Sequence, residues 1–96
     1  MEYIFRWDEE KAEANRRKHG ILFEEAESVF ADEFYVTYSD EKHSDEEERF
    51  LTFGNSMRSR LLVVIHTQQE IDPNLTLVRI ISCRKVTRKE RQNYEG

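Results

Sequence analysis

The hydrophobic positions of this chain recur at helical spacing in its first third and at strand spacing further on. Residues 2–7 combine aromatic and aliphatic side chains, as a short strand does. A mostly polar segment follows, in which Asp8 is a suitable N-cap and Gly20 suits the left-handed position after a helix. Apolar residues then recur at helical spacing over residues 23–30. The pattern predicts one strand and two helices, the first of them ending at His19.

Four later segments have the β-branched and aromatic composition of strands. They are residues 34–38, 49–53, 61–65 and 75–81. The third of these is continuously apolar, as expected of a central strand. Between the first and second, residues 40–48 are polar and strongly acidic, which predicts a loop. Turns at 54–59 and 70–74 are short enough to join the last three strands into an antiparallel meander.

Thr87 opens the last predicted element, a helix that reaches about Tyr94. Thr87 and Glu90 have the spacing of a capping box, in which each side chain bonds the other residue's backbone amide. The elements therefore run strand, two helices, four strands and a helix. That order predicts a single small α+β domain over residues 1–96.

The formal net charge of -5 conceals two unequal parts of the chain. Residues 1–56 carry 7 Lys+Arg against 16 Asp+Glu, whereas residues 57–96 carry 8 against 4. A local basic surface can bind phosphates whatever the total charge.

The chain has one cysteine, Cys83, which excludes an internal disulfide. Because there is also no signal-peptide pattern and no apolar run long enough for a membrane span, we expect a cytoplasmic protein.

Six cations lie within residues 79–91, around the start of the last helix. Cations such as Arg84, Lys85 and Arg88 oppose the helix dipole, at about 0.3–1 kcal/mol each near an exposed terminus. Exposed helix amides together with guanidinium groups form a natural phosphate site. This segment therefore predicts either a phosphate or nucleic-acid site or, equally, an ordinary basic surface turn.

The turns also predict which side chains share a face of the sheet. A hairpin centred between residues 71 and 72 places His66 opposite Leu77 and on the same face as Arg79. A hairpin centred between residues 57 and 58 places Arg49 opposite His66, with Arg60 on that face too. If the side chains of the last strand alternate regularly, Ser82 and Arg84 point to the face opposite Arg79, unless the strand bends near its end.

Arginines grouped with a histidine suit the cleavage of RNA by its own 2′-hydroxyl. Arginines would stabilise charge on the phosphate, and His66 is the one member of the group with an ordinary pKa near neutrality. The alternatives are a histidine hydrogen-bonded at the end of a buried strand and arginines paired with the many carboxylates. Ser82 is more simply a structural hydroxyl than a nucleophile. The histidines lack metal-site spacing and no glycine-rich phosphate loop occurs, so we expect no cofactor.

Several stretches in order resemble the BrnT family, the toxins of a type II toxin–antitoxin system. They are Phe5-Arg-Trp-Asp-Glu-Glu-Lys-Ala12 with Asn15, Lys18-His-Gly20, Phe23-Glu-Glu-Ala26, Val29-Phe-Ala-Asp32, Glu48-Arg49, Gly54, Leu62-Val-Val-Ile-His-Thr67, Arg79-Ile-Ile-Ser-Cys-Arg-Lys85 and Glu90-Arg91 with Tyr94. The resemblance covers nearly the whole chain. It implies a ribonuclease with a fold similar to RelE that cuts RNA without a metal, inhibits translation and growth, and is neutralised by an antitoxin.

The resemblance also assigns roles and partners. Arg79, Ser82 and Arg84 match the family's C-terminal motif, where part of the active site is expected, and Arg60 is a further catalytic candidate. Together with His66 these form the predicted catalytic set. We expect Arg49, Lys85 and Arg88 to bind the RNA. The implied partner is a BrnA-like ribbon-helix-helix antitoxin, in a hetero-tetramer of two copies of each chain, which contacts operator DNA only through the antitoxin.

The chain departs from the family pattern at Glu33, Cys83 and Gln69, and its 70–75 loop is longer than usual. A second hypothesis therefore stands beside the first. The basic C-terminal part can instead serve a non-catalytic interaction module, a degenerate toxin that binds a partner protein or nucleic acid.

Overall fold

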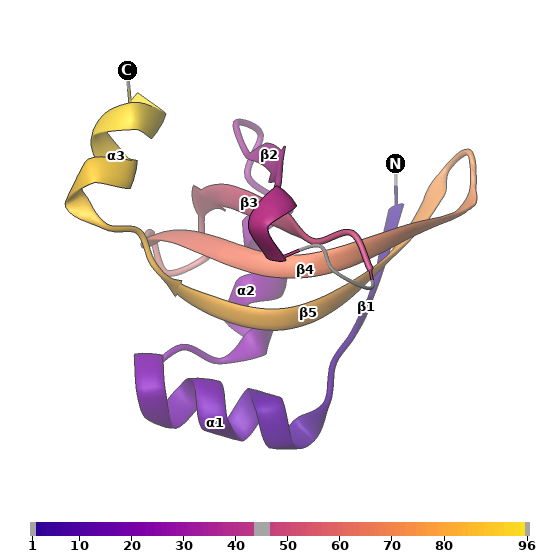
Figure 1. Cartoon of the computed structure of the whole chain (residues 1–96), viewed down its shortest axis with the longest axis horizontal. Helices are drawn as coiled ribbons and strands as arrows, with labels where there is room; N and C mark the ends of the chain where they lie inside the picture. Colours follow the sequence, from indigo (N-terminus) through magenta and orange to yellow (C-terminus); the bar gives the residue numbers. More distant parts are fainter. Residues whose placement is uncertain (1, 44–46, 96) are drawn as a thin grey trace.

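The computed structural model describes residues 2–43 and 47–95 and folds as helices against a five-stranded sheet (Figure 1). The elements in chain order are β1 (Glu2–Arg6), α1 (Glu9–His19), α2 (Phe23–Val29), β2 (Val36–Ser39), the short 3-10 helix η1 (Glu41–His43), β3 (Phe50–Asn55), β4 (Leu61–Asp72), β5 (Leu75–Lys85) and α3 (Arg88–Glu95). The predicted α+β class and element order are confirmed. No helix among the described residues is long and apolar enough to span a membrane.

The sheet has the order β1-β5-β4-β3-β2, so the apolar strand β4 is central, as its composition predicted. The β2–β3, β3–β4 and β4–β5 pairs are antiparallel, and β1 pairs parallel with β5. Figure 1 shows α1 and α2 on one side of the sheet and η1 and α3 on the other. The face that carries α2 is called the α2 face below, and the opposite face is called the open face.

The helix signals in the sequence act as predicted. The Asp8 carboxylate accepts hydrogen bonds from the amides of Glu10 and Lys11 at 2.8 and 3.1 Å, which satisfies two of the unpaired donors at the start of α1. Gly20 follows α1 with φ 69°, in the left-handed region where a residue with a Cβ is strained. These caps fix both ends of α1.

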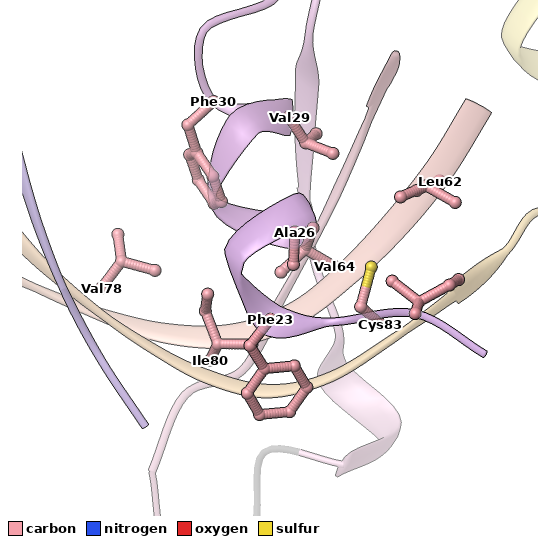
Figure 2. Close-up of a cluster of buried hydrophobic side chains, with 10 residues drawn as sticks. Phe23, Ala26, Val29, Phe30, Leu62, Val64, Val78, Ile80 and Cys83 are labelled. Carbon is pink, nitrogen blue, oxygen red and sulfur yellow. The ribbon is translucent and has the colours of Figure 1, made fainter. Parts of the chain in front are cut away.

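The core lies between α2 and the sheet, and Figure 2 shows its side chains. The apolar stripe of α2 packs on strand residues that alternate onto the α2 face. The buried members from α2 and from the residue that follows it are Phe23, Ala26, Val29 and Phe30, and those from the sheet are Leu62, Val64, Val78, Ile80 and Cys83. The sheet approaches α2 closely at Gly54, where an added Cβ would lie 3.0 Å from Val29 Cγ1.

The predicted register of the second hairpin is wrong by three residues. The turn lies at Pro73 and Asn74, and His66 is paired with Ile80 instead of Leu77. The Asp72 carboxylate accepts from the Asn74 amide at 2.7 Å, which together with the fixed φ of proline closes the turn late in the loop. The late turn alone moves the register by four residues, and the register shift between Glu70 and Asp72 reduces this to three at His66. Because three is odd, the correction moves His66 to the α2 face, away from Arg79.

The predicted register of the first hairpin is wrong by one residue. Phe50, and not Arg49, is paired with His66. The Ser56 amide donates to the Arg60 carbonyl at 2.9 Å, and Ser59 within the turn has φ 59°. This hydrogen bond closes a loop of three residues, 57–59, so the hairpin is centred on residue 58 and not between residues 57 and 58. The predicted grouping of Arg49, Arg60, His66 and Arg79 on one face is therefore wrong.

Candidate active site

Three predicted site residues of β5 lie on the same face of the sheet because the strand contains a bulge. Their partners on β4 are Thr67 for Arg79, Ile65 for Ser82 and Val63 for Arg84, which alternate along the open face. The register of the β4–β5 pair shifts between Ile65 and His66. A bulge inserts one extra residue and so reverses the alternation beyond it. The bend thus brings Arg79, Ser82 and Arg84 together, which simple alternation would not do.

Arg84 forms a two-pronged ion pair with Glu90 of α3. The Arg84 Nη1 and Nη2 atoms lie 2.8 and 3.0 Å from Glu90 Oε1 and Oε2. The same carboxylate accepts from the Thr87 amide at 2.8 Å, and the Thr87 hydroxyl accepts from the Glu90 amide at 3.1 Å, so the predicted capping box is present. Arg84 is the main cause that lowers the pKa of Glu90 to about 2. The start of α3, where a phosphate site was one of two equal alternatives, is thus occupied by the protein's own carboxylate, while Lys85 and Arg88 beside it are exposed.

Arg79 lies on the open face at the level of the acidic loop. It pairs with Glu47, and the side chains are 50% and 56% exposed. Exposed ion pairs contribute only about 0–1 kcal/mol, so an incoming phosphate can compete for this guanidinium. Arg49 lies just before β3, and its carbonyl accepts from the Asp40 amide at 2.8 Å.

Hydrogen bonds of Asn15 hold α1 against the edge of β5, in the part of β5 that is not paired with β1. Its amide group donates to the carbonyls of Ile21 and Cys83 at 3.0 and 2.9 Å. Its side-chain oxygen accepts from the Cys83 amide at 3.0 Å and from the Ser82 hydroxyl at 3.1 Å. The sequence prediction of a structural Ser82 hydroxyl agrees with this contact, which also holds α1 next to the predicted site.

A recess of about 200 Å³ lies between α1 and the end of β5. Among its lining residues are Lys11, Lys18 and His19 from α1 and Ser82 from β5. His19 is half-buried; burial, followed by the charges of Lys18 and Arg84, lowers the pKa of its imidazole. The recess is therefore basic, and it lies directly beside the strand end that carries Arg84.

The sequence predicted no catalytic role for His19, which is the last residue of a predicted helix, part of a stretch that resembles the family, and a histidine without metal-site spacing. A signal was available in the spacing. Lys11, Asn15 and Lys18 stand at i, i+4 and i+7, which places three polar residues on one face of α1. A polar stripe facing a sheet edge indicates a functional surface better than a position at a helix end does.

His66, in contrast, is fully buried at 0% exposure. Its Nδ1 lies 3.1 Å from the Thr67 carbonyl and its Nε2 lies 2.7 Å from the Thr52 hydroxyl. Nδ1 must carry the hydrogen, because a carbonyl only accepts, and Nε2 then accepts from Thr52. Burial lowers the pKa of His66 to about 4. The structure thus favours the alternative of a histidine hydrogen-bonded within a buried strand.

Arg60 also lies away from the β5 site. Its guanidinium is bound to Glu25 of α2, with Nε 2.9 Å from Oε2, and the Ser56 hydroxyl donates to the same oxygen at 2.6 Å. Glu25 is 2% exposed, and Arg60 is the main cause that lowers its pKa. Arg60 therefore neutralises a buried carboxylate at the α2 side of the sheet and is not brought to Arg79 or Arg84.

The open face also carries an apolar groove of about 370 Å³ between α3 and the edge of the sheet. Aromatic side chains from three elements line it, and the ring of Phe53 is stacked on Tyr94 with 6.4 Å between centroids. The Tyr94 hydroxyl donates to the Phe34 carbonyl at 3.1 Å, which positions α3 over this groove. Glu90 lines the groove as well, so it adjoins the Arg84 pair.

Comparison with known proteins assigns the chain to a family. Residues 7–90 match the model of the family described as "Ribonuclease toxin, BrnT, of type II toxin-antitoxin system". The chain belongs to the BrnT family. A solved structure, that of the ribonuclease toxin BrnT of Brucella abortus, is 21% identical and superposes with a TM-score of 0.60 over 92% of this chain and 100% of that chain. At this identity the similarity shows a shared fold. No curated protein matches the chain.

BrnT membership places the chain among ribonuclease toxins of type II toxin–antitoxin systems, which implies an antitoxin as partner. The matched range contains both the basic recess and the arginines of β5.

Cys83, one of the departures from the BrnT pattern, is 0% exposed in the core, and burial raises the pKa of its thiol to about 12. It acts there as a small apolar residue. The predicted likeness to RelE stays a prediction.

Proposed function

We propose that this chain is a metal-independent endoribonuclease toxin whose active site lies at the bulged end of β5. The observation that carries the proposal is the placement of Arg79, Ser82 and Arg84 on one face, beside a basic recess. In the proposed reaction the ribose 2′-hydroxyl attacks the adjacent phosphate and the 5′-oxygen leaves. Negative charge builds up on the phosphate in the transition state, and guanidinium groups fixed in place stabilise it.

Arg84 is the main candidate for that role. Its two-pronged contact with Glu90 presents the guanidinium fork to a pair of oxygens, which is also how arginine binds phosphate. RNA would take the place of Glu90 at Arg84 and of Glu47 at Arg79. We propose that Arg49, Lys85 and Arg88 bind neighbouring phosphates. His66 and Arg60 are left out of the site, because the structure places both on the α2 face in structural hydrogen bonds.

We also propose the partner in more detail than the family description gives. A BrnA-like ribbon-helix-helix antitoxin would neutralise the toxin in the cytoplasm, in a hetero-tetramer of two copies of each chain. The antitoxin, and not this chain, would contact operator DNA. Light scattering of the co-expressed pair measures the stoichiometry, and a mass that corresponds to one copy of each chain would contradict it.

The enzyme proposal is tested by incubating the purified chain with total RNA in EDTA, beside Arg84→Ala and Arg84→Lys variants. Arg58→Ala is the matched control, because Arg58 is exposed in the turn before β4. We expect cleavage by the parent and by Arg58→Ala, and loss of cleavage in both Arg84 variants, since lysine cannot reproduce the bidentate contact. Intact RNA with the folded parent would contradict the proposal.

One observation favours the interaction module. Arg60, Arg79 and Arg84 are each paired with a carboxylate of this chain, and for Arg60 and Arg79 this is the alternative that the sequence left open. A binding module requires cations only for affinity. If Arg84→Lys retained RNA binding while cleavage was lost, the module would be excluded. If the Arg84 variants changed affinity alone, the module would be the better account.

A further inference from the structure

The basic recess contains His19, to which the function proposed for the arginines of β5 assigns no role. Lys11, Lys18 and His19 line the recess from α1, and the Ser82 hydroxyl lines it from β5. Ser82 lies on the open face with Arg84, so the recess and the arginine site adjoin at this residue. A phosphate bound by Arg84 would place its neighbouring ribose next to the recess.

The backbone at His19 is held by contacts of the residues on either side of it. Asn15, one turn earlier on α1, is 6% exposed and makes hydrogen bonds with both backbone groups of Cys83. The left-handed Gly20 ends the helix directly after His19, and its amide donates to the Arg16 carbonyl at 2.8 Å. These contacts hold the end of α1 against the strand. The imidazole is therefore carried by a rigid element, as a proton-transfer group requires.

The surroundings of His19 favour its neutral form. The charged groups around it are Lys11 and Lys18 from α1 and Arg84 from β5, which is itself paired with Glu90 from α3. Burial and the cations together lower the pKa of the imidazole below its ordinary value of 6.5. A neutral imidazole at physiological pH can accept a proton, whereas the neighbouring lysines are suited to hold a phosphate.

We propose that His19 is a catalytic residue, the general base that removes the proton from the ribose 2′-hydroxyl, with Lys11 and Lys18 binding the phosphate backbone beside it. This inference rests on the proposed ribonuclease function. As the 2′-oxygen forms its bond to phosphorus, the proton passes to the imidazole. The bond from phosphorus to the 5′-oxygen breaks, its electron pair stays on that oxygen, and water supplies the proton. The products are a 2′,3′-cyclic phosphate and a 5′-hydroxyl.

The test compares His19→Gln and His19→Asn with His43→Gln, a matched control on η1, where His43 is exposed and bonded to Asp40. Cleavage of a fluorogenic RNA oligonucleotide is followed in EDTA from pH 4.5 to 9, beside Arg84→Ala. Binding is measured separately, with the same oligonucleotide carrying 2′-deoxyriboses. Circular dichroism confirms that each variant is folded, and the asparagine variant serves if the glutamine variant is not.

We expect the parent and His43→Gln rates to rise with pH to a plateau, because a general base must be deprotonated. The His19 variants should lose about 100-fold or more in rate and lose this rise, with binding unchanged. Added imidazole should restore part of their activity. Parental rates in folded His19 variants, or an equal loss at every pH, would overturn the role of His19. If Arg84→Ala were inactive in that case, the ribonuclease function would stand. An inactive parent would overturn both.

Discussion

Replacing Asn15 with alanine should cost this fold several kilocalories per mole, although Asn15 is a polar residue on a mostly exposed helix. The variant removes the hydrogen-bond partner of the Ile21 carbonyl, the Cys83 carbonyl and the Cys83 amide, three backbone groups of buried residues. A buried polar group left unsatisfied costs about 1–3 kcal/mol, so the three together give roughly 3–9 kcal/mol. Water from the adjacent recess can satisfy part of this demand. We therefore expect the lower end, about 3–5 kcal/mol.

Urea unfolding followed by circular dichroism measures this difference. Ser82→Ala removes only one donor to the Asn15 oxygen and should cost about 1 kcal/mol. Asn93→Ala is the matched control on exposed α3 and should change the free energy of unfolding by less than about 0.5 kcal/mol. A loss of under about 1 kcal/mol in Asn15→Ala would refute the reasoning, since α1 would then be held to β5 by its apolar contacts alone.

Three further predictions follow from buried contacts. Arg60→Ala leaves the Glu25 carboxylate buried and unpaired and should lower the free energy of unfolding by about 3–5 kcal/mol. Removing Glu25 as well should restore much of the lost free energy of unfolding. If Arg60→Ala instead lost all RNA cleavage while its stability in urea was unchanged, Arg60 would be catalytic. His66 has a folded pKa of about 4, below its unfolded value of about 6.5, so it stabilises the fold above pH 6.5 and this contribution is lost as pH falls from 6.5 to 4. The gap in urea midpoint between the parent and His66→Gln should shrink over that range, and a constant gap would contradict the assignment. Gly54→Ala sets a methyl group 3.0 Å from Val29 and should cost about 1–3 kcal/mol, where equal thermal midpoints would show that α2 moves freely.

The sequence by itself determined the elements and their order, because those depend on local signals. The Asp8 cap, the left-handed Gly20 and the Thr87–Glu90 capping box all act within four residues of chain, and the structure has all three. The apolar run of β4 likewise required a central position, since only a strand covered on both faces can bury every side chain. The basic end of β5 was also visible in the sequence, because the charge of a segment follows directly from its residue types.

Only the tertiary structure decided which side chains meet. The left-handed residue in the first hairpin, the register shift between Glu70 and Asp72 next to the turn at Pro73, and the bulge in β5 each change a register by one residue, and an odd change exchanges the two faces of a strand. These shifts moved His66 into the core and brought Arg84 to the face of Arg79. The parallel pairing of β1 and the docking of α1 through Asn15 join residues far apart in sequence. The histidine of the recess beside the arginine end of β5 is therefore His19, because proximity between elements depends on register and docking, which local sequence signals do not specify.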